Sequence, residues 1–523
     1  MAFLFMTAIT IFAGIITLYL INRFRSKEDG RPLPPGPKGI PFFGNVNDMP
    51  KPGTLECHHW ASFKDLYGPI SSLTVLKQTF VIINDPQIAF ELLRDKSAIF
   101  SSRPVQIFSG YLVGWRHATA MSPYNEAWKI HRKNVTKVIS TTVSVAAFDR
   151  IQEVESVHFL LNLLEKPNKL FDHIRTEAGS VILKTVYGYT TEARGNDPFV
   201  DLATKSMQQF ADATVPGRWV VDILPFLRYL PAWFPGAGFQ TTAQKMSVQL
   251  AQCVNQPYQF VKKQMREKKH KTSFLSQAIE SIGSDAEMEF IHKWTALALY
   301  LGGADTTVSS MMTFFLAMTL YPDVQRNARD EIDRVVGIGR LPVTADREQL
   351  PYIEAIMKEV HRWHPVLPMG LPHSSTEEIF YRGYRIPKGS VLLPNNWWFT
   401  HDPAVYSSPM TFDPSRHITT PTHPAEPDPR NFIFGYGRRI CPGRFVADNA
   451  LFITIAQSLA VFDIKKNTVE PEAKWETGTI SHPVPYEYII EPRSEDHRNL
   501  IRRSEEIYPW EQSDAKELET VKW

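Results

Sequence analysis

The chain has 523 residues and a formal net charge of +2, and 43% of its residues are hydrophobic against 21% charged. This composition supports a large buried core and excludes global disorder. The near-neutral charge argues against a nucleic-acid-binding protein, which carries a basic stripe or patch.

The first segment of the chain is an uncharged run over residues 1–21. As a helix it is long enough to cross the roughly 30 Å hydrocarbon core of a bilayer. Arg23, Arg25 and Lys27 follow it, and the positive-inside rule places the rest of the chain in the cytosol. No clear cleavage site follows the run, so we expect an uncleaved transmembrane signal anchor over residues 1–22. The basic, proline-rich residues 23–50 predict a spacer or semi-rigid hinge.

The rest of the chain divides into a main domain over residues 51–493 and a charged tail. Apolar periodicity predicts helices around 147–167 and 241–268, over Asp285–Tyr321 and Pro351–Trp363, and after Cys441 through Ala456. Strand signals are sparser and cover Ser71–Ile83 and Tyr381–Leu393, the second with a turn at Ile386–Gly389. The mixed-charge residues 494–523 predict a solvated tail. The fold class is therefore mainly α with a minor β part.

Two motifs lie on predicted helices. Trp128 and Arg132 are four residues apart and share one helix face, a spacing that ordinary core packing also produces. The long helix contains Gly302-Gly-Ala-Asp-Thr-Thr307, in which each glycine costs roughly 1 kcal/mol relative to alanine. The glycines serve either close helix packing or the approach of a flat cofactor. In the second case Asp305 and Thr306 stand beside that cofactor and can relay protons.

Two charged motifs follow. Glu359 and Arg362 are three residues apart on one helix face, a spacing that by itself is common and weak. Further along lies Phe412-Asp-Pro-Ser-Arg416, which contributes a second arginine.

Three cysteines are present, Cys57, Cys253 and Cys441, and their odd number and wide spacing indicate no disulfide framework. Cys57 and Cys253 are interpreted as small buried hydrophobes. Cys441 lies in Phe434-Gly-Tyr-Gly-Arg-Arg-Ile-Cys-Pro-Gly443, just before a predicted helix.

The residue types of this loop suit a metal-binding thiolate. A helix that begins at Pro442 would offer partial positive charge and free N–H groups to the sulfur. Gly435, Gly437 and Gly443 allow a tight backbone beneath a flat ligand, and Arg439 can pair with a carboxylate of that ligand. The alternative to metal binding is that Cys441 is an ordinary buried cysteine in a glycine-rich turn.

This loop matches the pattern Phe-x-x-Gly-x-Arg-x-Cys-x-Gly, and with the other motifs in their order the chain resembles the cytochrome P-450 superfamily. It looks most like fungal, membrane-anchored members of secondary metabolism. The resemblance implies the P-450 fold and haem b with Cys441 as the axial iron ligand, a thiolate that in these enzymes promotes O–O cleavage. The implied haem contacts are Trp128, Arg132, His373, Phe434 and Arg439.

The resemblance also implies roles for the remaining motifs. Asp305 and Thr306, with Gly303, match the superfamily's oxygen-activation motif. Glu359, Arg362 and Arg416 would form a buried charge network that holds the cysteine loop. Many relatives carry Pro-Glu-Arg where this chain has Pro414-Ser-Arg416, but the arginine is kept.

The implied activity is a monooxygenase that inserts one oxygen atom from O₂ into a hydrophobic small molecule, a terpenoid first and a polyketide second. The chain has no glycine motif for a flavin or a nicotinamide. Electrons are therefore expected from NADPH through a separate flavoprotein reductase, docked near Arg438 and Arg444. The location implied is the endoplasmic reticulum membrane. The implied pocket residues are Phe290, Trp294, Leu297, Ala298, Leu301, Val366, Leu367, Met369 and Ile480.

Three other classes compete with this interpretation. A haem-thiolate enzyme that rearranges hydroperoxides needs neither O₂ nor a reductase, but such enzymes tend to lack the acid–threonine pair. A non-enzymatic haem-binding membrane protein, such as a sensor or carrier, needs no glycine-bearing helix over the cofactor. A membrane-anchored helical scaffold without haem would leave the ordered motifs as coincidence.

Overall fold

The computed structural model describes residues 30–51, 53–139, 142–215, 217–282, 285–469 and 471–523. The predicted anchor, residues 1–22, lies outside these ranges. Among the residues that are described, no helix is both long and apolar enough to cross a membrane.

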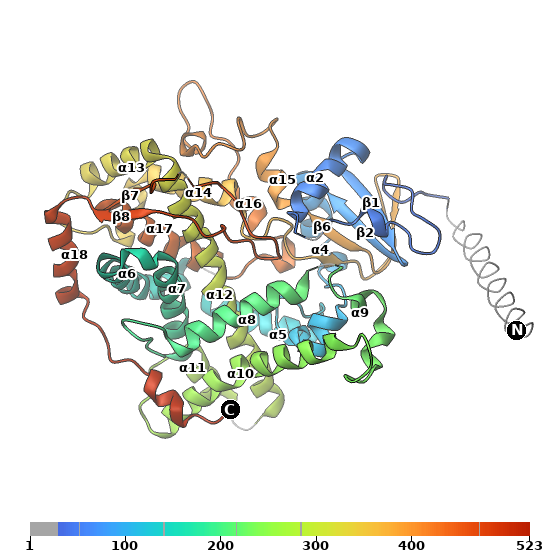
Figure 1. Cartoon of the computed structure of the whole chain (residues 1–523), viewed down its shortest axis with the longest axis horizontal. Coiled ribbons are helices and arrows are strands. Elements are labelled where there is room, and N and C mark those ends of the chain that lie inside the picture. Colours follow the sequence, from blue (N-terminus) through green and yellow to red (C-terminus); the bar gives the residue numbers. More distant parts are fainter. Residues whose placement is uncertain (1–29, 52, 140–141, 216, 283–284, 470) are drawn as a thin grey trace, which may run out of the picture.

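The long central helix α12 (Ala286–Leu320) passes through the middle of the molecule, and the other helices pack around it (Figure 1). The carboxylate of Asp285 caps its first turn by accepting from the backbone N–H groups of Glu287 and Met288. Pro322 ends it and begins α13. The other helices of eight or more residues are α2 (Glu56–Tyr67), α5 (Glu126–Ile139), α6 (Thr142–Glu165), α7 (Leu170–Tyr187), α8 (Pro198–Thr214), α10 (Gly238–Arg266), α11 (Phe274–Ile282), α13 (Pro322–Val335), α14 (Pro351–Trp363), α17 (Arg444–Val461) and α18 (Glu495–Ile507). All five predicted helices are confirmed.

Short helices complete the α part, and three small sheets form the β part. The short α-helices are α3 (Pro86–Ala89), α4 (Ser97–Phe100), α9 (Val220–Ile223), α15 (Asn396–His401) and α16 (Arg430–Ile433). One sheet has the order β1-β2-β6-β3, a second pairs β4 with β5, and a third pairs β7 with β8. Their bounds are β1 (Ile70–Val75), β2 (Gln78–Ile83), β3 (His373–Ser374), β4 (Ile379–Tyr381), β5 (Tyr384–Ile386), β6 (Val391–Pro394), β7 (Phe462–Lys465) and β8 (Ile489–Pro492). The predicted strand region Ser71–Ile83 is a hairpin, because Leu76 and Lys77 both adopt positive φ.

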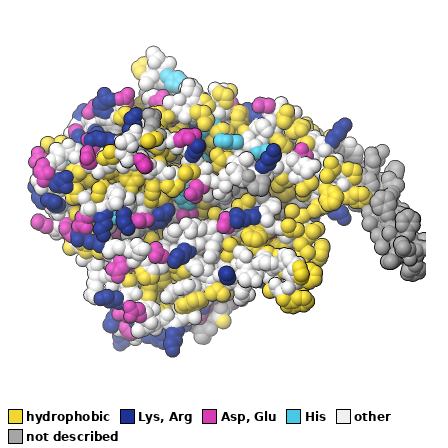
Figure 2. All heavy atoms as spheres, viewed as in Figure 1, with side chains coloured by type: hydrophobic (Ala, Val, Ile, Leu, Met, Phe, Trp, Pro, Cys, Tyr) yellow, Lys and Arg dark blue, Asp and Glu magenta, His cyan; other side chains and the backbone are white. Residues whose placement is uncertain are grey.

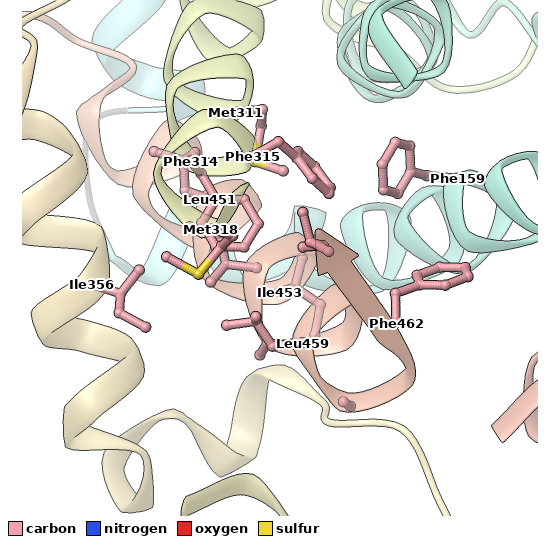
Figure 3. Close-up of a cluster of buried hydrophobic side chains, with 14 of the residues drawn as sticks. Phe159, Met311, Phe314, Phe315, Met318, Ile356, Leu451, Ile453, Leu459 and Phe462 are labelled. Carbon is pink, nitrogen blue, oxygen red and sulfur yellow. The ribbon is translucent and has the colours of Figure 1, made fainter. Parts of the chain in front are cut away.

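The largest hydrophobic core lies where α6, α12, α14 and α17 meet (Figure 3). Phe314, Phe315 and Met318 of α12 are fully buried there, against Leu459 of α17 and Ile356 of α14. Burying each such side chain contributes about 1.5–3 kcal/mol. This core fixes α12 against α17, the helix that follows the cysteine loop.

The proline-rich segment is bound to the main sheet over its described part. Ser72 of β1 donates from its backbone N–H to the carbonyl of Pro35 and from its hydroxyl to that of Pro34. A Cβ at Gly36 would lie only 1.7 Å from the carbonyl oxygen of Ser72, so only glycine fits this close approach. The stretch that ends in Pro37 is therefore part of the folded domain.

The prediction of a solvated tail over residues 494–523 is wrong. Residues Glu495–Ile507 form α18, which packs against α6 and buries Leu500 and Ile501. Near the C-terminus, Leu518 and Val521 join the cluster of buried side chains that includes those of α8 and α10. The high charge of the segment hid an amphipathic pattern, in which a few apolar residues at helical spacing suffice to bind it to the core.

Candidate functional site

The cysteine loop, residues 434–443, connects α16 to α17 and is folded tightly on itself. The backbone N–H of Cys441 donates to the carbonyl of Phe434 at 2.7 Å. Gly437 has φ +52°, and a Cβ there would lie 2.6 Å from the carbonyl oxygen of Leu93. The helix begins at Arg444, two residues after the predicted start at Pro442. The N-terminus of α17 still faces the sulfur, because the N–H groups of Gly443 and Arg444 hydrogen-bond to it.

The thiol of Cys441 has a raised pKa in the protein alone. Burial is the largest cause, and it outweighs the N–H groups and the positive charges of Arg132 and Arg444, which all favour the thiolate. A coordinated metal cation would supply the remaining charge, since a coordinating thiol is deprotonated outright. The sulfur therefore suits a metal ligand better than a free nucleophile.

One buried and two partly buried arginines gather beside the loop, and no described carboxylate pairs with them. Arg439 donates to the backbone carbonyls of Ser101, Thr119 and Ser122 at 2.7–3.0 Å. Arg103 donates to the carbonyls of Ala120, Leu371 and Pro372 at 2.7–2.9 Å. Arg132 donates to the carbonyl of Ile440, the residue before the cysteine, at 2.6 Å. Within the described part of the chain, no carboxylate pairs with any of the three.

These cations carry a clear electrostatic cost. Burial lowers the pKa of Arg103 to about 9. Burial and the neighbouring Arg103 and Arg132 lower the pKa of Arg439 to about 8. Burial also lowers the pKa of His373, whose Nδ1 lies 2.7 Å from the carbonyl oxygen of Phe100. An anion placed among these groups would relieve the cost.

Trp128 adds an unsatisfied donor to the same cluster. Its indole Nε1 is buried and has no hydrogen-bond partner among the described residues. The guanidinium of Arg439 stacks over its ring, 4.3 Å from the centroid. Three guanidinium groups and one free indole N–H beside a cysteine fit a flat metal complex with two carboxylates, which is what haem b is. Arg103 was missed in the sequence, where Ser101-Ser-Arg-Pro104 has no pattern that distinguishes it from a surface arginine.

The middle of α12 is more open than its surroundings. Gly302 is exposed and residues 303–307 are partly exposed, whereas residues 308–319 are buried. A Cβ at Gly302 would meet nothing within 4 Å, so its glycine leaves open space. A Cβ at Gly303 would lie 3.0 Å from Ile182 of α7, so this glycine serves helix packing. Residues 441–450 are also only partly buried, which leaves a second open surface within the fold.

The acid and the threonine of α12 have different partners. The hydroxyl of Thr306 donates to the carbonyl of Gly302 at 2.7 Å, within its own helix. The carboxylate of Asp305 forms an ion pair with His482, with Oδ1 and Nε2 3.2 Å apart. No sequence pattern marked His482, which lies 177 positions after Asp305 (482 − 305).

The expected ion pairs around Glu359 are all present. Arg362 donates two bonds of 2.8 Å to the Glu359 carboxylate, and Arg416 donates one of 3.2 Å. His417 adds a contact of 3.0 Å, and the backbone N–H of Asp413 one of 2.8 Å. Glu359 and Arg362 have no exposed surface. The cluster therefore links α14 to residues 413–417, as a buried structural network would.

A second charged cluster flanks the cysteine loop directly and was not predicted. Arg430 of α16 donates to Glu354 of α14 at 2.7 Å and to Asp448 of α17 at 3.1 Å. Arg347 donates to both of these carboxylates as well. Because Arg430 and Asp448 lie on either side of the loop in sequence, these bonds fix both of its ends against α14. This cluster could not be recognised in the sequence, because its residues are spread over about 100 positions.

The predicted pocket residues do not share one environment. Phe290 is 44% exposed, and Leu297 has no exposed surface. Met369 packs with Cys57 and Trp60, whereas Trp294, Leu301 and Ile480 belong to the cluster that includes Leu297. Ala298, Val366 and Leu367 are partly buried. Their contact with a substrate stays a prediction.

The two predicted docking arginines differ in exposure. Arg438 is exposed and donates to the hydroxyl of Tyr124, over whose ring it lies 5.1 Å from the centroid. Arg444 is partly buried and lies 4.5 Å from the centroid of Phe445.

Comparison with known proteins assigns this architecture to a family. The Cytochrome P-450 family model matches residues 34–490. The chain is 43% identical to the cytochrome P-450 monooxygenase claR of Ampulloclitocybe clavipes, over 97% of this chain and 94% of the relative. It is 41% identical to the cytochrome P-450 monooxygenase ppsD of Aspergillus oryzae, over 93% and 94%. It is also 41% identical to O-methylsterigmatocystin oxidoreductase of Aspergillus flavus, over 98% of both chains.

Proposed function

Because this chain belongs to the cytochrome P-450 family and is a monooxygenase, we propose that it oxidises a hydrophobic small molecule of fungal secondary metabolism, with Cys441 as haem ligand. The observation that carries the cofactor assignment is the cluster of three guanidinium groups and one indole N–H beside Cys441, for which the described residues supply no carboxylate. Haem b supplies the iron at which O₂ is reduced and cleaved.

The chain's own residues would hold the cofactor at its metal and at its two carboxylates. The sulfur of Cys441 would bind the metal, with its charge supported by the N–H groups of Gly443 and Arg444. Arg103, Arg132, Arg439 and the Nε1 of Trp128 would bind the two carboxylates, and His373 lies among them. These bonds would fix the orientation of the ring plane.

Asp305 and Thr306 would manage protons on the α12 side. The carboxyl of Asp305 would receive protons and pass them inward, and the hydroxyl of Thr306, after leaving the carbonyl of Gly302, would donate a hydrogen bond into the open space beside that glycine. The exposed glycine at 302 leaves space for this rearrangement. Without such a pair, reduced oxygen would leave the site as peroxide.

Electrons would come from a separate NADPH-dependent flavoprotein reductase. Arg438 is exposed within the cysteine loop, so an acidic patch on a partner can reach it. The described fold has no second domain that could hold a flavin or nicotinamide.

We propose that the chain is anchored by residues 1–22 in the membrane of the endoplasmic reticulum, with the catalytic domain in the cytosol. Its support is the uncharged N-terminal run and a group of exposed apolar side chains that follow α9. Phe226, Tyr229 and Trp233 are 64%, 74% and 81% exposed. Figure 2 shows hydrophobic side chains gathered at the lower right of the view, where Figure 1 labels α9. Exposed apolar patches of this kind suit contact with lipid.

A terpenoid is the first substrate class we propose, and a polyketide the second. Their support is the mostly apolar set of predicted pocket residues and the fungal secondary-metabolite relatives. Screening both classes with a reductase and NADPH would decide between them.

The proposed cofactor chemistry is tested by the spectrum of the reduced protein with carbon monoxide. Full-length protein should give the strongly red-shifted Soret band of thiolate-ligated haem, and Cys441→Ala should lose it. Cys253→Ala, which removes a cysteine buried away from the loop, should retain it. A Soret band typical of histidine ligation, or no haem in folded protein, would refute the proposal.

A further inference from the structure

A loop near the C-terminus, residues 475–486, lies along one face of α12. His482 contacts Asp305, the hydroxyl of Ser309 donates to the carbonyl of Ser481 at 2.6 Å, and the hydroxyl of Tyr486 donates to the carbonyl of Met312 at 2.7 Å. The three positions on α12 are spaced i, i+4 and i+7, which is one helical face. The loop is thus fastened to the helix at three points, and one of them is the acid of the oxygen-activation motif.

The contact at His482 is chemically different from the other two. The Ser309 and Tyr486 bonds join a hydroxyl to a backbone carbonyl and are neutral. The contact between Asp305 and His482 joins a carboxylate to an imidazole, the side chain whose charge changes near neutral pH. The pair of Asp305 and His482 is not needed to hold the loop against α12, because the two neighbouring hydroxyl bonds already do so.

The surroundings of His482 keep its proton available. Burial lowers its pKa, but the hydrogen bond and charge of Asp305, together with the charge of Glu476, outweigh burial and leave the pKa raised. Arg175 opposes this effect, and His364 also faces the imidazole. Among described residues, Nδ1 of His482 has no hydrogen-bond partner, and the side chain keeps 19% of its surface exposed. Water can therefore reach the imidazole on the side away from Asp305.

We propose that His482 is the positioning residue that holds Asp305 and resupplies its proton from solvent. This inference rests on the proposed function, since it assigns the source of the protons that Asp305 passes inward. In the step, the proton on Nε2 of the imidazolium moves to Oδ1 of the carboxylate. The neutral imidazole keeps its proton on Nδ1. A half-turn of the ring then brings this N–H to Asp305 and turns the vacant Nε2 toward solvent, where it takes a proton from water, so charge and protons balance over the cycle. The ion pair also turns the carboxylate toward the loop until it is protonated, which limits premature proton transfer.

The first test measures the pair directly and needs no turnover. Full-length protein carrying histidine labelled with ¹³C at Cε1 is titrated by NMR as its diamagnetic ferrous–carbon monoxide complex, and the His482 signal is assigned by its loss in His482→Gln. The titration midpoint should lie above that of an ordinary histidine in the wild type and fall in Asp305→Asn. Equal midpoints in the two proteins would overturn the pairing.

The second test separates proton supply from loop fastening. Product formed per NADPH consumed is measured from pH 6 to 9, together with released peroxide. In the wild type this ratio should fall as the pH rises through the His482 midpoint, because the imidazolium is lost. His482→Gln should lower the ratio by about tenfold or more and remove the pH dependence, with peroxide making up the difference.

The matched control is Ser309→Ala, which loosens the same loop without removing a titratable group. It should lower the melting temperature while keeping the wild-type ratio and its pH dependence. If Ser309→Ala reproduces the loss seen in His482→Gln, or if His482→Gln keeps the wild-type profile, His482 is only a fastening residue. Retention of the red-shifted carbon monoxide band in His482→Gln would show that such a result refutes this inference and leaves the proposed function intact.

Discussion

The guanidinium carbon of Arg439 lies 4.3 Å from the centre of the Trp128 ring, and the Nε1 of that ring is buried and has no hydrogen-bond partner among the residues that the structure describes. The two residues lie far apart in the sequence, one in α5 and one in the cysteine loop. Their contact joins a cation–π interaction, worth up to about 2 kcal/mol when desolvated, to a donor that is free to bind a ligand. This combination makes Trp128 a residue whose polar atom serves the cofactor while its ring serves the fold.

Trp128→Phe should therefore weaken haem binding with little effect on folding. The change keeps an aromatic ring under Arg439 and removes only the N–H, a bond to a charged group worth about 1.5–3 kcal/mol. Haem loss to apomyoglobin should accelerate by about 10- to 100-fold, measured by the change in absorbance. The matched control is Trp398→Phe, because the Nε1 of Trp398 is also buried without a partner but lies on α15. Equal haem loss from the two variants would contradict this role.

Glu359→Gln should destabilise the protein strongly. Its carboxylate is fully buried and contacts Arg362, Arg416 and His417, so neutralising it leaves these groups uncompensated, at about 3–5 kcal/mol. Urea unfolding at pH 7 measures the loss. The control Asp323→Asn, at a side chain that is 83% exposed, should change stability by less than about 0.5 kcal/mol.

The ion pairs of Glu359 should also make the stability of the protein depend on pH. Burial raises the pKa of Glu359, but the bonds from His417 and Arg362 outweigh it and leave the pKa below its ordinary value. A depressed folded pKa means that the stabilisation is present above the unfolded pKa and is lost as the pH falls through the folded pKa. Wild-type stability should therefore fall more steeply than that of Glu359→Gln below about pH 4.5. If the free energy of unfolding fell equally with pH in both proteins, Glu359 would not be the group that titrates.

Glu177 should make the stability of the protein depend on pH in the opposite direction. Burial raises the pKa of this carboxyl to about 8, against the bond from Thr454 of α17. The folded state therefore binds a proton that the unfolded state has lost between pH 4.5 and 8, so the free energy of unfolding falls as the pH rises through this window. Glu177→Gln keeps an acceptor for Thr454 and should remove this slope, measured by urea unfolding at pH 5.5 and 8. If Glu177→Gln kept the wild-type pH dependence, another group would be responsible for it.

Arg438→Glu should slow reduction by the reductase at low ionic strength. A reversed charge on an exposed arginine of the cysteine loop reduces the electrostatic attraction of an acidic partner, and the effect is screened by salt. Stopped-flow measurement of the first electron transfer should show a several-fold loss that shrinks at high salt. Arg503→Glu, an exposed reversal on α18, is the control and should have no such effect. Normal reduction of Arg438→Glu would move the docking surface away from this loop.

Much of the architecture was determined by the sequence itself. The apolar periodicity, the lack of an internal proline and the stop at Pro322 were sufficient to place α12, because they are local features of the chain. The cysteine loop was equally visible, since its glycines, its arginine and its cysteine lie within ten residues. Glu359, Arg362 and Arg416 were identified by their order along the chain, and the structure brings them together.

Only the tertiary structure decided the partners that lie far apart in sequence. Arg103 joins the cation cluster because its loop packs against Leu371 and Pro372, and nothing near it in the sequence marks it as buried. His482 meets Asp305 because a loop near the C-terminus returns along α12. The residues after 494 are folded because a few apolar side chains find a core built by α6 and α10. Local propensity sets where helices begin and end, but burial and charge pairing depend on which distant surfaces meet, and that is decided only when the chain packs.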